Sequence, residues 1–298
     1  MSLPITEHEN PNTRNIDRVS TLDALRLIND EDKRVALAVE QVLPAIAQTI
    51  DRVVERLKKQ GRLIYIGTGT SGRLGVLDAS EIPPTFGVNY DLVQGVIAGG
   101  YDALYKATEA SEDESNAGAD DLRSRNIGPN DSIIGIAASG RTPYTIGALR
   151  YAREMGCFTA CITCVPGSEI TNHADVAIVP VVGPEAITGS SRMKAGTAQK
   201  MVLNMISTVA MVKLGYVSGN RMTNVKPSNT KLKERSLNIL MAETALGEQA
   251  AAELLQNADG DLRVALVIFR SGAGPSAARA ALERSEWQIA RAIDSLLS

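Results

Sequence analysis

One pattern recurs from residue 62 to residue 182: a short apolar run that ends in glycine or small polar residues, followed by a stretch with helical spacing. The runs occupy residues 62–67, 92–98, 132–138, 158–164 and 177–182. Apolar runs of this length indicate strands that are buried on both faces. Strands that alternate with helices form a parallel sheet with helices on both faces. The sequence therefore predicts an α/β fold with a doubly wound parallel sheet.

Helical segments flank this central region. Apolar residues recur with a period close to 3.6 from residue 32 to residue 59, and Pro44 within that stretch predicts a kink or two separate helices. The preceding segment, rich in proline and asparagine, predicts an extended arm, and Ser20 or Thr21 is suited to cap the next helix. We expect an N-terminal arm and helix over residues 1–54, the sheet domain over 55–218 and a small helical C-terminal appendage over 219–298. Within that appendage, residues 262–268 fit either a short strand or an apolar helix.

Three loops combine glycine, hydroxyl side chains and an arginine, over residues 67–73, 138–143 and 188–194. Glycine lets the backbone turn sharply and approach a ligand. Free amides at a helix N-terminus, together with serine and threonine hydroxyls, form a cradle for phosphate. The loops therefore predict a phosphate site. The predicted substrate-binding residues are Gly69, Thr70, Ser71, Gly72, Ser139, Gly140, Thr142, Ser190 and Ser191.

The same loops also allow a purely structural interpretation. All three could be tight turns between a strand and a helix, and Ser190 and Ser191 could cap the helix that follows them. The loops also contain cationic side chains. Arg73, Arg141 and Lys194 could each complement the charge of a phosphate or simply lie on the surface.

Composition argues against several kinds of ligand. The formal net charge is −3, and 3 Phe, 7 Tyr and 1 Trp offer few rings for base stacking, so we expect no nucleic-acid partner. Two distant histidines and three clustered cysteines do not supply a closed four-ligand zinc site, so we expect no metal. Residues 67–72 have the spacing of a dinucleotide loop, but no acidic residue ends a strand about 20 residues later. We therefore expect no cofactor.

We also expect a cytoplasmic protein without a membrane partner. The first 20 residues are polar and contain no apolar signal core. The longest apolar stretch, residues 201–217, is interrupted by Asn204, Ser207, Thr208 and Lys213, which a bilayer-spanning helix would not tolerate.

The loops belong to longer motifs that run through most of the chain. These are I-D-R-V-S-T at 16–21, N-D-E-D at 29–32, L-D-A-S-E-I-P-P-T-F at 77–86, I-A-G-G at 97–100, E-A-S-E-D at 109–113, A-A-S-G-R-T-P-Y at 137–144 and residues 188–200. Together they resemble the sugar isomerase (SIS) family of phosphosugar-binding proteins, and within it the etherases that act on N-acetylmuramic acid 6-phosphate. The block at 77–86 combined with Glu112 and Asp113 is the most specific part. In the last quarter of the chain the resemblance is weaker, and it implies no functional residue there.

The resemblance implies an activity and two catalytic residues. Such a lyase cleaves the C3 D-lactyl ether of N-acetylmuramate 6-phosphate by elimination and hydration, in cell-wall amino-sugar recycling. Glu81 matches the family's acid/base glutamate, most often described as the proton donor, and Glu112 matches the second glutamate, the partner base. Taken alone, Glu81 could be an exposed acid near a helix end, and Glu112 lies in an acidic run of the kind that is usually solvated.

Two further expectations concern partners and alternatives. Since SIS folds usually pair, we expect a homodimer that binds a small phosphosugar. The competing functions on this fold are a phosphosugar isomerase, which would share the base and the phosphate loops without releasing lactate, and a non-catalytic phosphosugar-sensing regulator. The presence of both Glu81 and Glu112 favours the etherase.

Overall fold

The computed structural model describes residues 3–106, 112–224 and 230–298. The chain divides into two compact units, Met1–Glu81 with Tyr90–Ser207, and Ile82–Asn89 with Thr208–Ser298. The first unit contains the sheet, and the second is mainly helical.

The first unit is built on a five-stranded sheet in the order β2-β1-β3-β4-β5, in which every strand pairs parallel with its neighbour. The strands are β1 (Leu63–Gly67), β2 (Val93–Ile97), β3 (Ser132–Ile136), β4 (Phe158–Ile162) and β5 (Val176–Ile178). Each overlaps one of the predicted runs, although β5 ends four residues earlier than its run predicts, and all residues of β1, β3 and β4 are buried. The predicted doubly wound parallel sheet is confirmed.

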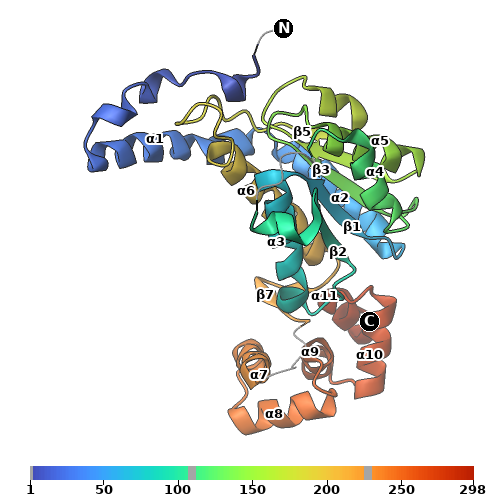
Figure 1. Cartoon of the computed structure of the whole chain (residues 1–298). Coiled ribbons are helices and arrows are strands. Elements are labelled where there is room, and N and C mark those ends of the chain that lie inside the picture. Colours follow the sequence, from blue (N-terminus) through green and yellow to red (C-terminus); the bar gives the residue numbers. More distant parts are fainter. Residues whose placement is uncertain (1–2, 107–111, 225–229) are drawn as a thin grey trace. The chain divides into compact units, whose positions relative to one another are not determined.

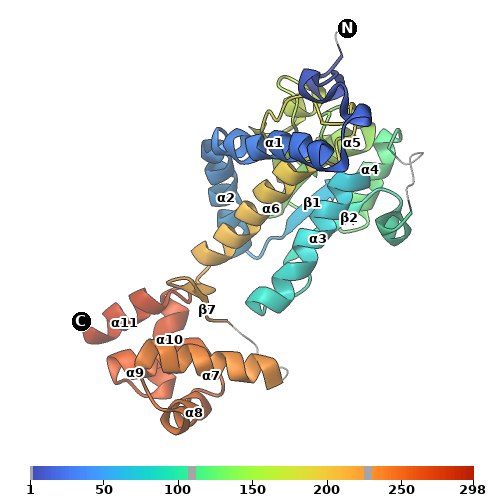
Figure 2. The same ribbon diagram turned by 90° about the vertical axis from the view of Figure 1, so that its left-hand side faces the viewer.

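Helices cover both faces of the sheet (Figures 1 and 2). They are α2 (Leu43–Lys58), α3 (Gly69–Phe86), α4 (Ser115–Arg123), α5 (Pro143–Glu154) and α6 (Lys194–Lys213). On one face, α5 packs against β3, where a Cβ at Gly135 would meet Leu149 and Thr145, and α4 packs against α5. On the other face, α3 packs its Gly75 against Tyr65, and α2 places arginines over the ring of Phe158.

The N-terminal segment folds back onto this unit. Helix α1 (Thr21–Glu40) begins after Ser20, whose hydroxyl accepts a hydrogen bond from the Asp23 amide, and α2 begins with Pro44 in its first turn. The expected division at Pro44 is therefore confirmed. The arm before α1 is not simply extended, because it forms the short 3-10 turns η1 (Ile5–Glu7), η2 (Pro11–Thr13) and η3 (Ile16–Arg18).

The described residues of the second unit form a helical bundle and a small antiparallel pair of strands. The helices are α7 (Thr230–Thr244), α8 (Glu248–Asn257), α9 (Leu262–Ser271), α10 (Pro275–Arg284) and α11 (Ile289–Leu297), and the strands are β6 (Val217–Ser218) and β7 (Arg221–Met222). Leu240, Leu266, Leu282 and Ile289 pack in its core. The segment that fitted a strand or a helix is thus helical. None of the helices among the described residues has the length and apolar character that crossing a bilayer requires.

Candidate active site

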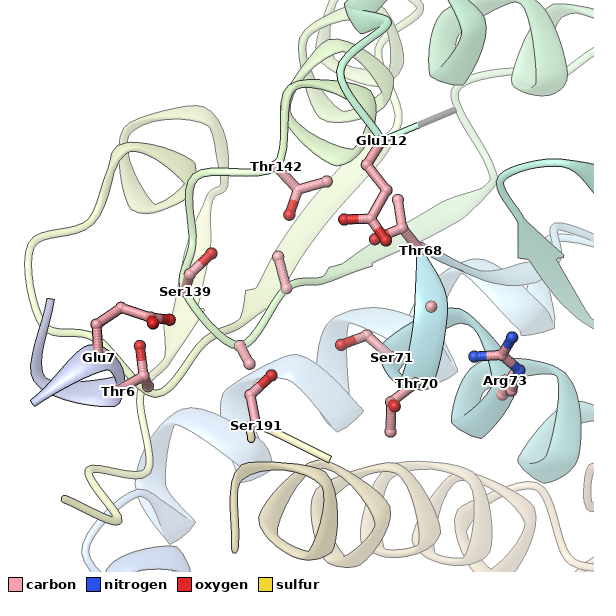
Figure 3. Close-up of a pocket in the computed structure, with 13 residues that line it drawn as sticks. Thr6, Glu7, Thr68, Thr70, Ser71, Arg73, Glu112, Ser139, Thr142 and Ser191 are labelled. Atoms are coloured by element: carbon pink, nitrogen blue, oxygen red, sulfur yellow. The ribbon is translucent and has the colours of Figure 1, made fainter. Parts of the chain in front are cut away.

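A pocket of about 330 Å³ lies where the chain leaves β1 and β3 (Figure 3). These strands are neighbours, and the chain crosses from β2 on one side of β1 to β3 on the other. Open parallel sheets bind ligands at such a switch in strand order, beyond the carboxyl ends of the strands. The pocket is lined by Thr6, Glu7, Thr68, Gly69, Thr70, Ser71, Arg73, Glu112, Ala137, Ala138, Ser139, Thr142 and Ser191.

The first wall of the pocket is the N-terminus of α3. Gly69 has φ +48°, a left-handed conformation that glycine adopts without strain. The first turn closes when the Gly72 amide bonds the Thr68 carbonyl, and within the described residues the amides of Gly69, Thr70 and Ser71 have no partner. Free amides at a helix N-terminus carry partial positive charge. This wall is therefore suited to bind an anion.

The second wall is the loop between β3 and α5. Ser139 and Thr142 both line the pocket, and Thr142 precedes α5 without capping it through its side chain. Gly140 has φ +67°, and a Cβ at that position would collide with Ser168. The loop thus presents two hydroxyls to the pocket and needs glycine between them.

Glu112 faces these loops from a third side. Glu112 is half-buried, and a Cβ added at Gly69 would lie 3.3 Å from the Glu112 Oε1 atom. The backbone of Glu112 is held because its carbonyl accepts a hydrogen bond from the Tyr144 amide at 3.1 Å. Among the described residues its carboxylate has no hydrogen-bond or ion-pair partner, and it is therefore free to meet a ligand. Residues 109–111 of the same motif lie outside the described residues.

The third predicted loop contributes only Ser191 to the pocket. The helix after it, α6, is capped by Glu185, whose buried carboxylate accepts hydrogen bonds from the Lys194 and Ala195 amides at 2.9 Å each. Burial raises the pKa of Glu185. This N-terminus is therefore already occupied, and Ser190 and Ser191 do not cap α6. Lys194 is neither a pocket nor a surface residue, because its ammonium forms a buried ion pair with Glu31.

Several other predicted site residues lie away from the pocket lining. Gly72 packs against the sheet, where a Cβ would lie 2.6 Å from the Gly67 carbonyl oxygen. Gly140 and Ser190 shape their loops without lining the cavity. Glu81 is exposed on α3, ten residues after Ser71 and thus about 15 Å further along the helix axis. The chain's own fold brings Glu112 to the hydroxyl loops but not Glu81.

The sequence did not single out Thr6 and Glu7 of the N-terminal arm as site residues. Thr6 and Glu7 line the pocket from η1 (Figure 3). No local signal marks them, because they lie in an irregular segment far from the loops in sequence. Arg73 also lines the pocket, and its Nε donates to the Leu104 carbonyl at 3.0 Å. Within the described part of the chain, no cluster of three or more histidine, cysteine, aspartate or glutamate side chains could hold a metal ion.

Comparison with known proteins places the chain among its relatives. The family described as "SIS domain" matches residues 114–209, and "Glucokinase regulatory protein N-terminal SIS domain" matches residues 45–153. A solved phosphoheptose isomerase from Neisseria gonorrhoeae is 17% identical with a TM-score of 0.51, covering 65% of this chain and 100% of that chain, which shows the fold alone.

Curated relatives match nearly the whole chain. The N-acetylmuramic acid 6-phosphate etherase of Clostridium beijerinckii is 51% identical over 98% of this chain and 96% of its own length. The enzyme of that name from Photorhabdus laumondii is 51% identical over 94% of this chain and 93% of its own. With half of its residues identical to these enzymes from end to end, the chain belongs to the N-acetylmuramic acid 6-phosphate etherase family.

Proposed function

We propose that this protein converts N-acetylmuramate 6-phosphate and water to N-acetylglucosamine 6-phosphate and D-lactate. The observation that carries the proposal is the free carboxylate of Glu112, which faces a cradle of hydroxyls and amides in a chain that belongs to the etherase family. The cradle is suited to bind the phosphate, and the carboxylate is suited to transfer a proton. A phosphosugar regulator would need the first feature but not the second.

In this proposal the phosphate lies at the start of α3. The amides there and the hydroxyls of Thr70, Ser71, Ser139 and Thr142 surround it, with Ser191 at the edge. Gly69, Gly72, Gly140 and Ser190 give the loops their shape. The Ser71 hydroxyl donates its one proton to Gln199 Oε1 at 3.0 Å, which holds this turn of the cradle in place and leaves the Ser71 amide to face the phosphate. A preformed cradle binds with less loss of side-chain entropy.

The chemistry follows from the position of the ether. In the open-chain sugar the aldehyde acidifies the C2 proton, and the C3 oxygen lies β to the carbonyl. A base removes the C2 proton, the C2–C3 double bond forms, and the C3–O bond breaks as an acid protonates the departing lactate oxygen. Water then adds to C3 and a proton returns to C2. We assign Glu112 and Glu81 to these proton transfers, each of which contributes about 10²–10⁴-fold.

Glu81 is not among the residues that line the pocket of one copy, and we propose that a second copy supplies it. Glu81 is exposed on α3 within one copy of the chain. A symmetric dimer, the commonest closed oligomer, places the same residue of each copy against the other. We therefore propose a homodimer in which Glu81 of one copy joins the pocket of the other.

The remaining parts of the proposal concern organisation and setting. We assign residues 55–218 to the phosphosugar-binding domain, preceded by the arm and helix of 1–54 and followed by the helical region of 219–298. The substrate is a phosphorylated sugar acid of the bacterial cell wall. We therefore place the enzyme in the cytoplasm, in peptidoglycan recycling, without a cofactor.

The first test is a lactate assay with N-acetylmuramic acid 6-phosphate in ¹⁸O-water. We expect D-lactate release, with the label at C3 of the product sugar, because the water oxygen enters there after elimination. Glu112→Gln should retain phosphosugar binding but lose at least a hundredfold in turnover. Label in lactate would mean that the other C–O bond breaks. Sugar binding without lactate would instead support the regulator.

A further inference from the structure

Two residues of the N-terminal arm face the pocket without a partner in the protein. Thr6 is 1% exposed, and its Oγ1 has no hydrogen-bond partner among the described residues. The Glu7 carboxylate likewise has no hydrogen-bond or ion-pair partner in the described part of the chain, although a Cβ at Gly189 would lie 3.0 Å from its Oε2. Buried polar groups are nearly always satisfied. The unpartnered buried hydroxyl of Thr6 therefore points to a ligand, and the exposed carboxylate of Glu7 lies open beside it at the same pocket.

The arm is fixed in this position by several contacts. Asn10 Nδ2 donates to the Pro184 carbonyl at 3.1 Å, and Thr13 Oγ1 donates to the Ala186 carbonyl at 2.7 Å. Asn12 Nδ2 donates at 2.8 Å to Glu31, which is itself paired with Lys194. Both ends of the 184–194 segment are thus tied to the arm. These hydrogen bonds hold the arm against the rest of the unit and so fix the positions of Thr6 and Glu7.

The charges in the pocket indicate which part of a ligand these residues meet. A carboxylate only accepts hydrogen bonds, and it repels a phosphate dianion, which offers no proton. The phosphate cradle is formed by the amides and hydroxyls at α3 and after β3. In Figure 3, Thr6 and Glu7 lie at the edge of the cradle, near Ser139, and on the opposite side of the cavity from Thr70, Ser71 and Arg73. The groups that suit Glu7 are the neutral donors of a sugar, its hydroxyls or its acetamido N–H.

We propose that Thr6 and Glu7 bind the sugar moiety of the substrate, with Glu7 accepting a hydrogen bond from a hydroxyl or acetamido N–H. This inference rests on the proposed function for the identity of the sugar. It makes the arm part of the active site and assigns to it the recognition of the carbohydrate, while the loops recognise the phosphate. Glu7 is the specificity-determining residue of the pair, because its charge requires a donor on the ligand.

The experiment compares the binding of two probes by calorimetry. N-acetylglucosamine 6-phosphate carries sugar and phosphate, and inorganic phosphate carries no sugar. For Glu7→Gln we expect about three- to tenfold weaker binding of the phosphosugar, since the amide oxygen can still accept the hydrogen bond but no longer carries a charge. Binding of inorganic phosphate should stay unchanged or become tighter, because a negative charge has been removed. The matched control is Glu9→Gln on the same arm, where an exposed glutamate forms an ion pair with Arg14, and both probes should bind as in the wild type.

Thr6→Val gives a second readout that separates binding from folding. Valine matches threonine in shape and removes an unsatisfied hydroxyl, so the melting temperature should not fall. Phosphosugar binding should nevertheless weaken about two- to tenfold.

The outcomes separate this inference from the proposed function. Equal weakening of both probes in Glu7→Gln, or no change in either, would overturn the inference even if the wild type releases lactate. If the wild type releases no lactate but its phosphosugar binding depends on Glu7, the proposed function fails and the sugar contact stands.

Discussion

Glu31 is a buried carboxylate that joins three segments of the first unit. It lies on α1, accepts a hydrogen bond from Asn12 of the arm and pairs with Lys194 at the start of α6. Burial alone would raise its pKa, but hydrogen bonds from Lys194, Asn12 and Asn10 outweigh that effect and lower the pKa to about 2 from 4.5. The ionised form therefore stabilises the fold that carries Thr6 and Glu7.

A pH dependence of stability follows from this shift. Because the folded-state pKa lies below the unfolded value of 4.5, the contribution of Glu31 is complete above pH 4.5 and is lost as the pH falls toward 2. Glu31→Gln should cost about 3 kcal/mol or more at pH 7, because it leaves Lys194 buried without a counter-charge. It should also lose less stability than the wild type between pH 5 and pH 3. Urea unfolding at both pH values measures this difference, and equal losses in the two proteins would contradict the assignment.

The sequence indicates which residues meet at the pocket where they directly follow neighbouring strands. Ser71, Ser139 and Thr142 follow strands, and the ends of parallel strands meet at one edge of a sheet, so their convergence could be expected. The role of Lys194 could not be predicted, because its ion-pair partner Glu31 is 163 residues away in sequence. The position of Thr6 in the pocket could not be predicted for the same reason, since it depends on how the arm packs against distant residues.

The pair of helices α4 and α5 positions Glu112 through close backbone contact. A Cβ at Gly147 of α5 would collide with the Ser115 carbonyl, and one at Gly118 of α4 would collide with the Tyr144 carbonyl. The same tyrosine donates its amide to the Glu112 carbonyl. Glycine at these positions lets the two helices approach closely enough to hold the segment that carries the carboxylate.

Separating these helices should therefore affect catalysis as well as stability. Gly147→Ala must push α4 away from α5, and we expect a loss of about 1–3 kcal/mol in unfolding free energy. Turnover of the protein that remains folded should fall at least tenfold, because Glu112 is displaced. The control is Gly128→Ala, since no atom lies within 4 Å of a Cβ there. Stability and kcat are measured at the same temperature, and a Gly147→Ala enzyme with normal kcat would remove α4–α5 packing from the positioning of Glu112.

At the level of elements, the spacing of apolar residues and the positions of glycine and proline were sufficient to predict the strands and most of the helices. The runs at 62–67 and 132–138 became β1 and β3 because continuous apolar segments of that length fit a sheet covered on both faces. The order of the strands did not follow, because pairing is decided by long-range packing. The arm was expected to be extended, but Asn10 accepts a hydrogen bond from the Asn12 amide and starts a 3-10 turn at Pro11.

At the scale of the whole molecule, the feature to explain is the source of the second proton-transferring group. The proposed elimination needs two proton-transferring groups, yet the fold of a single chain brings Glu112 to the pocket and leaves Glu81 exposed on α3. Either Glu81 acts from a second copy, or another group takes its place, and Glu7 is the carboxylate that lines the pocket together with Glu112. These two arrangements predict different behaviour when subunits are mixed.

Two inactive variants distinguish them. Glu81→Gln and Glu112→Gln are co-expressed with different affinity tags, and the mixed dimer is purified through both tags. If each pocket combines Glu112 of one copy with Glu81 of the other, one pocket has both glutamines and the other has both glutamates, so the mixed dimer should regain about half of the wild-type kcat. If both glutamates act within one chain, every pocket keeps one substitution and no activity returns. A Glu81→Gln homodimer that is active on its own would remove Glu81 from the reaction and leave the second proton transfer to a residue of the pocket itself.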